Sequence, residues 1–144
     1  MSESSFRLLL AKMPRTSEVG GLPQQKDVIM IERIGLTDRW SDAVVVGNLI
    51  FLSGHIAEKT RGQSVKVQTE EVLLDMEDTL AKAGVTKDNL VSVNIFLADM
   101  SGFNEMNEAW DAWVSIGHAP ARATVESRLA HPDLAVEMTA VAAK

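Results

Sequence analysis

Two charged residues stand inside C-terminal stretches that otherwise look like a β core. Arg122 follows a proline turn in the segment Pro120–Glu126, and Glu137 interrupts the apolar run Val136–Ala142. In a protein interior, an arginine needs a carboxylate partner, and a glutamate needs a cation or hydrogen bonds. Either the two side chains pair with each other, or one of them faces solvent, or they belong to a functional site. The residues alone leave these alternatives open.

Common catalytic and nucleotide-binding motifs are absent. The sequence has no G-x-S-x-G, no P-loop, no G-x-G-x-x-G and no H-E-x-x-H. His55, His118 and His131 are scattered at no metal-ligand spacing, so we expect no metal. Cysteine and tyrosine are missing, which removes thiol nucleophiles and a phenol that could act as acid or base. Spacing alone does not exclude a Ser–His–Asp triad, but no local motif supports one.

Composition indicates a globular domain that acts on small molecules or proteins. The 144 residues are 46% hydrophobic and 24% charged, which suffices for a core without disulfides. Twenty acidic and 14 basic residues give a net charge of −6, whereas nucleic-acid binders usually have a basic excess. No apolar run approaches about 20 residues, so we expect no transmembrane helix. The lack of cysteine fits a reducing compartment, and we expect a cytoplasmic location.

The chain divides into an N-terminal extension, residues 1–29, and a domain, residues 30–144. The extension has one short apolar burst, Phe6–Ala11, followed by a Gly-, Pro- and Gln-containing stretch that is typical of a linker. The burst is too short for a signal-peptide core, although three nearby positive charges leave a targeting leader as an alternative. The remaining residues predict one packed α+β unit.

Hydrophobic periodicity predicts the order strand, strand, helix, strand, helix, strand, strand. Residues 44–52 form two strands joined at Gly47-Asn48, which is a hairpin signal. A helix is predicted from Thr69 to Ala83, with Gly84 as its stop, and Ser101 is expected to cap the second helix. Further strands are predicted at residues 90–97, 123–126 and 134–142, the first with Val91, Val93 and Ile95 on one face. The helix stripes are Val72, Met76, Leu80 and Ala83, and Phe103, Met106, Trp110 and Trp113.

One face of the predicted sheet lacks a cover. The two predicted helices would lie on the same face, and no further helix remains for the other. A wide, bare apolar sheet face is a liability in solution. We therefore expect a partner subunit to cover that second face.

Three segments together resemble the signature blocks of the RidA family, also called the YjgF/YER057c/UK114 family. They are Gly47–Ile56, Pro120–Val125 and Val136–Val141, within a resemblance that runs from about Ile31 to Lys144. The Ser-Gly and Pro-Ala-Arg blocks are specific in combination, because two predicted helices separate them, whereas either block alone is weak. The chain looks like a divergent subfamily.

The resemblance implies a chorismate-mutase-like α+β fold, with one sheet and two helices on one face. It also implies a homotrimer whose sheets pack inward and whose active sites lie between subunits. The characterised branch hydrolyses reactive enamines and imines, such as 2-aminoacrylate, to a 2-keto acid and ammonia, without cofactor or metal. The implied partners are a small enamine or imine substrate and further copies of this chain, with no nucleic acid and no membrane.

The resemblance also assigns two catalytic residues. Arg122 matches the arginine that holds the substrate carboxylate, a task that suits its planar, bidentate guanidinium. Glu137 matches the glutamate that holds and polarises the attacking water. The implied reaction is an acid–base hydration in which the enamine becomes an imine, water adds to its carbon, and ammonia leaves.

Four further residues match binding positions. Ser53 and Asn107 match polar pocket residues, and Thr124 matches a position often filled by cysteine. Trp40 stands where the best-known branch has a tyrosine, and the loop before Ala119-Pro120 is shorter than in that branch. These departures bear on the range of substrates.

Two other functions stay open at this point. A non-catalytic trimer could bind or sense small carboxylates such as 2-keto acids, and it would use Arg122 without depending on Glu137. A role on RNA is the other alternative, and the net charge of −6 opposes it.

Overall fold

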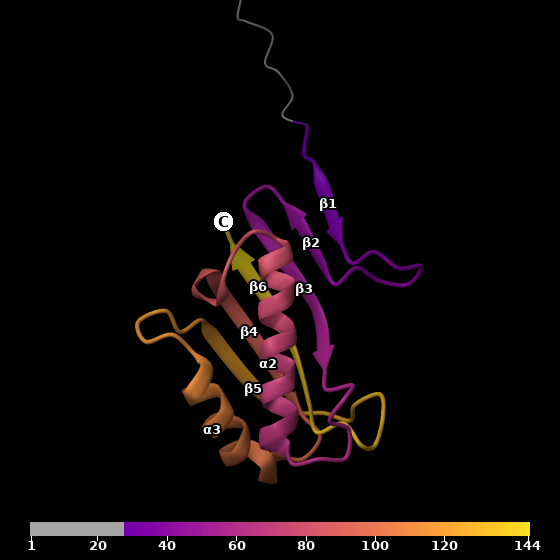
Figure 1. The fold of residues 1–144 in the computed structure, drawn as a ribbon, viewed down its shortest axis with the longest axis vertical. Coiled ribbons are helices and arrows are strands. Elements are labelled where there is room, and N and C mark those ends of the chain that lie inside the picture. The colour runs from indigo at the N-terminus through magenta and orange to yellow at the C-terminus, as the bar shows by residue number, and fades with distance from the viewer. Residues whose placement is uncertain (1–27) are drawn as a thin grey trace, which may run out of the picture.

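A six-stranded sheet with the strand order β1-β2-β3-β6-β4-β5 organises the protein (Figure 1). The computed structural model describes residues 28–144. Neighbouring strands are antiparallel except β4 and β5, which are parallel. The elements are β1 (Ile31–Ile34), β2 (Ala43–Val46), β3 (Leu49–Ile56), α2 (Val65–Lys82), a 3₁₀ turn at Lys87–Asn89, β4 (Leu90–Leu97), a 3₁₀ turn at Met100–Gly102, α3 (Phe103–Trp113), β5 (Ala121–Glu126) and β6 (Val136–Ala143).

The expected α+β arrangement, a single sheet with two helices on one face, is confirmed. Strands β2 and β3 form the predicted hairpin, with Val46 opposite Leu49 and Gly47 at a φ of 57° in the turn. The first strand, β1, was missing from the prediction. Its residues Ile31–Ile34 are mostly exposed and show no alternation, so only pairing with β2 identifies it as a strand.

Helix α2 begins four residues earlier than predicted. The hydroxyl of Ser64 accepts a hydrogen bond from the backbone N–H of Val67 and caps the helix there. The first turns bury the polar residues Gln68 and Thr69, and Gln68 precedes the first residue that apolar periodicity assigns to the helix. The amide of Gln68 is fully bonded, to the backbone of residues 63, 133 and 135. The predicted stripe of α2 is otherwise correct, since Val72, Met76, Leu80 and Ala83 are all buried.

The expected cap of the second helix is wrong. Ser101 does not cap α3; instead, the carboxylate of Asp99 accepts a bond from the N–H of Ser101 and starts a 3₁₀ turn. Helix α3 then starts at Phe103 without a side-chain cap. Its inner face contains the predicted Met106 and Trp110, whereas Phe103 is 37% exposed.

The inward set of β4 also differs from the prediction at one position. Val91 is 48% exposed because a bulge shifts the pairing with β6 between Leu90 and Ser92. Leu90 is therefore buried in its place, and Val93 and Ile95 point inward as expected. The core lies between this face of the sheet and the two helices.

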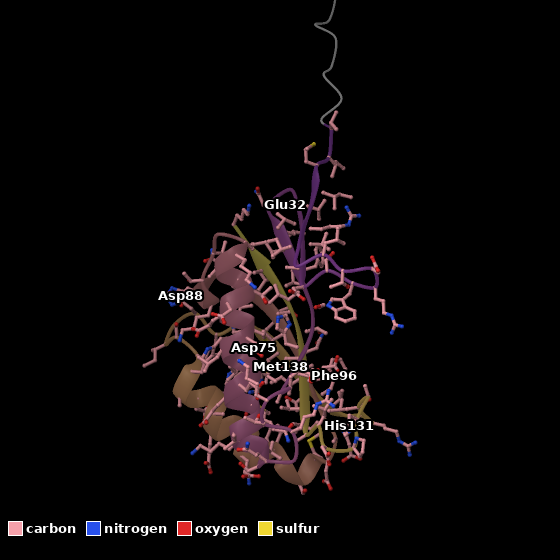
Figure 2. The ribbon with its side chains drawn as sticks, turned by 45° about the vertical axis from the view of Figure 1, so that its right-hand side comes forward. Glu32, Asp75, Asp88, Phe96, His131 and Met138 are labelled. Atoms are coloured by element: carbon pink, nitrogen blue, oxygen red, sulfur yellow. The ribbon has the colours of Figure 1, made fainter. Side chains whose placement is uncertain are left out.

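The second sheet face has no helix over it in the part of the chain that is described. In β6, Val136, Met138, Ala140 and Ala142 are buried toward the helices, while the residues between them face the other way. Figure 2 shows Asp75 on α2 to one side of the sheet and Phe96 on the other. The open face also holds Phe51, which is 43% exposed. No helix within residues 28–144 is both long and apolar enough to span a bilayer.

Glu71 on α2 organises the connection from β3 into the helix. Its carboxylate accepts bonds from the N–H groups of Lys59 and Thr60, each at 2.8 Å, and from the Thr60 hydroxyl. Burial raises the pKa of Glu71, but these three hydrogen bonds together outweigh it and hold the pKa below its usual value. The bonded loop depends on the ionised carboxylate.

We expect Glu71→Gln to destabilise the protein at neutral pH by about 0.5–1.5 kcal/mol, because an amide offers one acceptor where three donors converge. The lowered folded-state pKa means that this stabilisation is present above the unfolded-state pKa and is lost as the pH falls through the folded-state value. Thermal melting at pH 7 and at about pH 3 should therefore show a gap between variant and wild type that shrinks in acid. Glu70→Gln, at the exposed neighbouring position, is the control. An equal gap at both pH values would contradict this role.

Candidate functional site

Arg122 lies on the edge strand β5, and helix α3 holds its side chain. Nη1 donates a hydrogen bond to Oδ1 of Asn107 at 2.8 Å, and the guanidinium carbon lies 5.1 Å from the ring centroid of Trp110. The cation–π contact and the hydrogen bond orient the charged group while leaving it exposed to solvent. None of the ion pairs within residues 28–144 involves Arg122. Its remaining N–H groups can therefore bind an anion.

Thr124 provides a second polar group on the same strand. It lies two residues beyond Arg122, so both side chains project from the same face of β5. Its hydroxyl oxygen is buried and has no hydrogen-bond partner in the described part of the chain. A buried, unpaired hydroxyl costs about 1–3 kcal/mol, so this group is a natural partner for a water or a ligand atom.

Glu137 lies on the open face of the sheet. It is the second residue of β6, opposite Ile56 of β3 and Phe96 of β4, and its neighbours in sequence are buried toward the helices. A Cβ atom added to Gly54 would collide with Oε1 of Glu137. Glycine at position 54 is therefore what allows the carboxylate to lie against the backbone of β3.

Ser53 precedes this glycine and is bonded elsewhere. Its N–H and its hydroxyl both lie near the backbone oxygen of Asp42, at 3.0 and 3.3 Å. Ser53 therefore ties β3 to the residue before β2 and stands beside the Gly54–Glu137 contact. The structure thus brings Ser53 near Glu137 and separates both from Arg122.

The suggestion that Arg122 and Glu137 form an ion pair is wrong for a single chain. Arg122 pairs with Val93 of β4, whose side chain is buried toward the helices, and it contacts α3 on that same side. Glu137 projects from the opposite face and lies on a strand two places from β5. The sheet itself separates the two charges.

Trp40 lies apart from both groups of site residues, the cluster around Arg122 and the cluster around Glu137. It belongs to the connection between β1 and β2, where the Thr37 hydroxyl donates to the Trp40 backbone oxygen at 3.0 Å, and its side chain is 55% exposed. Trp40 is therefore not a core residue. Strands β1 and β5 are the opposite edges of the sheet, so one chain does not bring Trp40 to Arg122.

Two residues that touch the candidate site were not assigned to it from the sequence. Trp110 is expected from its spacing to be a packing residue, and it does pack against Trp113. Its ring also makes the cation–π contact with the guanidinium of Arg122. The signal was its spacing: Trp110 follows Asn107 by three residues, which places both on one helix face. Gly54 belongs to the block Gly47–Ile56 that carries the family resemblance. Only the pairing register of β3 and β6 shows that it lies against Glu137.

Metal-binding geometry is a separate question. Within residues 28–144, no three histidine, aspartate or glutamate side chains gather as a metal ion would require. The side chains that the two clusters offer for chemistry are the guanidinium of Arg122, the carboxylate of Glu137 and uncharged polar groups.

Comparison with known proteins gives a consistent result. The family model described as Endoribonuclease L-PSP matches residues 30–144. A RutC family protein of Haemophilus influenzae is 41% identical over 112 residues, which are 78% of this chain and 97% of that protein. The RutC family protein YoaB of Escherichia coli K12 is 41% identical over 113 residues, again 78% of this chain and 97% of the relative.

The fold agrees with a solved relative as well. A crystal structure of a YjgF family member from Neisseria meningitidis superimposes with a TM-score of 0.78 at 43% identity. The match covers 81% of this chain and 96% of the other. The sequence blocks, the sheet with its two helices and these relatives lead to one conclusion: the chain belongs to the RidA family, also called the YjgF/YER057c/UK114 family.

Proposed function

We propose that the protein hydrolyses small enamines and imines that bear a carboxylate, of the 2-aminoacrylate type, to a 2-keto acid and ammonia. The observation that carries this proposal is the exposed, oriented guanidinium of Arg122, held by Asn107 and Trp110 beside the unpartnered hydroxyl of Thr124. A preformed cation with free N–H groups fits a small carboxylate, which it can hold through two parallel hydrogen bonds. Family membership agrees with the assignment.

The reaction needs a positioned water and a base. An enamine gains a proton on its terminal carbon and loses one from its nitrogen, and it thereby becomes an imine, whose central carbon is electrophilic. A water held by Glu137 adds to that carbon and gives one proton to the carboxylate. That proton passes to the nitrogen and completes a carbinolamine. The hydroxyl proton of the carbinolamine then moves to the nitrogen, which leaves as ammonia, and the C–O bond becomes the ketone of the product. Arg122 holds the substrate carboxylate throughout.

One chain supplies these groups on two separate surfaces, and we propose that a homotrimer joins them. Arg122, Thr124 and Asn107 lie at the β5 edge on the helix side, while Glu137 and Ser53 lie on the open face. In a closed ring, the edge of one copy meets the open face of the next, and each contact repeats around the axis. Such packing would also cover the apolar residues of the open face.

The remaining site residues have binding roles in this proposal. The hydroxyl of Thr124 bonds the substrate or its water, Asn107 orients the guanidinium of Arg122, and Ser53 holds the strand beside Glu137. Trp40 extends from the opposite edge of its own subunit to border the site of a neighbour. We also propose that residues 30–144 form the working domain, that residues 1–29 are an extension, and that the protein acts in the cytoplasm without cofactor or metal.

Two rival functions use the same residues differently. A trimer that only binds 2-keto acids would need Arg122 but not Glu137. The description of the matching family names an endoribonuclease, and RNA cleavage is the other rival. The net charge of −6 favours a small anion at one local cation over a polyanion.

Substitutions of Arg122 and Glu137 should separate hydrolysis from binding. Arg122→Lys keeps the charge but loses the planar guanidinium that forms two parallel hydrogen bonds, so we expect KM to rise by about 5- to 150-fold. Arg122→Ala should abolish activity over background. Glu137→Gln should retain 2-keto acid binding and reduce kcat by about 100-fold or more, because it removes the base. Release of keto acid from enzymatically generated 2-aminoacrylate measures the rate.

The controls for these substitutions follow from the fold. Because Arg122 and Glu137 do not pair within a chain, neither variant should melt early. Arg128→Lys, at an exposed position outside the cluster, should behave as wild type. A normally folded Glu137→Gln that hydrolyses at the wild-type rate would favour the binding-only rival.

The assembly can be tested on the open sheet face. Light scattering should give three times the monomer mass of 15.7 kDa at micromolar concentration. Phe51→Asp places a charge on the open face and should dissociate the trimer and abolish hydrolysis together. Leu74→Asp, at a 58% exposed position on α2, should leave both unchanged. A wild-type protein that stays monomeric would contradict the proposed site between subunits.

Gly54→Ala tests the carboxylate contact directly. The added methyl group occupies the space of Oε1 of Glu137, so the carboxylate must move. We expect kcat to fall by about 10- to 100-fold, toward the value of Glu137→Gln, with KM changed by less than about threefold. Steady-state kinetics of the two variants, measured side by side, provide the comparison. Wild-type kinetics for a folded Gly54→Ala variant would show that the position of Glu137 does not matter.

A further inference from the structure

The backbone beside Glu137 is irregular. Along β3 and β6, Leu52 pairs with Ala140 and His55 pairs with Met138, so three steps on β3 match two steps on β6. Ser53 and Gly54 therefore face a single residue, Thr139, in a β-bulge. A bulge interrupts the ladder of backbone hydrogen bonds and needs another constraint to hold one conformation. This bulge also carries the glycine that contacts Glu137.

The side chain of His55 supplies such a constraint. Its Nδ1 lies 2.8 Å from the backbone oxygen of Ser53, and its Nε2 lies 2.8 Å from the hydroxyl of Thr79 on α2. Thr79 is only 5% exposed, and its hydroxyl also lies 3.1 Å from the backbone oxygen of Asp75. The imidazole therefore connects the bulge, through two hydrogen bonds, to a buried residue of the helix.

The protons on the two ring nitrogens of His55 determine which nitrogen donates and which accepts a hydrogen bond. A carbonyl oxygen only accepts hydrogen bonds, so Nδ1 of His55 must carry a proton. In the neutral ring, Nε2 accepts a hydrogen bond from the Thr79 hydroxyl. In the charged ring, Nε2 donates to that hydroxyl, which then donates to the backbone oxygen of Asp75. Both contacts exist in either charge state, so the connection is independent of the charge on His55.

We propose that His55 is a positioning residue for Glu137. It acts through the Ser53–Gly54 bulge: the bond to the Ser53 carbonyl holds the peptide chain against which the Glu137 carboxylate lies. His55 does not touch the reacting atoms and contributes no proton to the reaction. The role of Glu137 in hydrolysis rests on the proposed function, whereas the effect of His55 on the Glu137 carboxylate does not.

Two amide substitutions separate the contacts of the imidazole. The side-chain nitrogen of Asn lies near the place of Nδ1, and that of Gln lies near the place of Nε2. His55→Asn can keep the bond to Ser53, and we expect its kcat within about threefold of wild type. His55→Gln and His55→Ala lose that bond, and we expect kcat to fall by about tenfold or more while KM stays within about threefold. His118→Asn, at an exposed histidine before β5, is the control.

A spectroscopic readout makes the test independent of turnover. The ¹³C resonance of the Glu137 side-chain carboxyl, followed against pH in the full-length protein, reports the surroundings of the carboxylate. His55→Ala should shift its titration midpoint, and His55→Asn should return it to the wild-type value. If wild type fails to hydrolyse 2-aminoacrylate, the proposed function is wrong, and the resonance still decides the role of His55.

Three results would overturn the proposal. The first is a His55→Ala variant with wild-type kcat and an unchanged Glu137 resonance. The second is a folded His55→Asn variant as defective as His55→Ala. The third is a loss of kcat that follows melting temperature alone across the variants, because a purely structural histidine would give that pattern.

Discussion

Side chains alternate across the strands of one sheet, and the chain covers only one of the two faces with helices. Everything else about the candidate site follows from this constraint. On β6, the apolar residues Val136, Met138 and Ala140 are buried toward the helices, so the glutamate among them must face outward. On β5, the register with β4 turns Arg122 toward α3 instead. A sheet of this design presents its cation and its carboxylate on opposite faces.

The edge strand β5 gives Arg122 a setting that combines exposure with order. An arginine in the centre of the sheet would have to be desolvated and paired, at considerable cost. At the edge, the ring of Trp110 supports the guanidinium, and Asn107 accepts one of its protons. The side chain thus keeps free N–H groups in water without losing its orientation. Such preorganisation reduces the entropy lost when a small anion binds.

The region around Glu137 combines a missing side chain with an irregular strand. Gly54 provides the space for the carboxylate, and the bulge brings that glycine to the correct side of β3. His55 and Thr79 link this irregular backbone to helix α2, whose residues Val72, Met76 and Leu80 are fully buried. The apolar core and the candidate site are therefore mechanically connected through a few hydrogen bonds.

The amino-acid sequence determined the features that depend on near neighbours: the hairpin at Gly47-Asn48, the buried stripe of α2 that contains Val72 and Met76, and the residue types of the candidate site. Tertiary structure decided the rest. The buried amide of Gln68 on α2 is satisfied by residues 133 and 135, far along the chain, and Arg122 and Glu137 are separated because strand order and register set their faces. Turns and helix stripes arise from contacts within a few residues, whereas faces, bulges and pairings depend on contacts between distant segments, which no local pattern encodes.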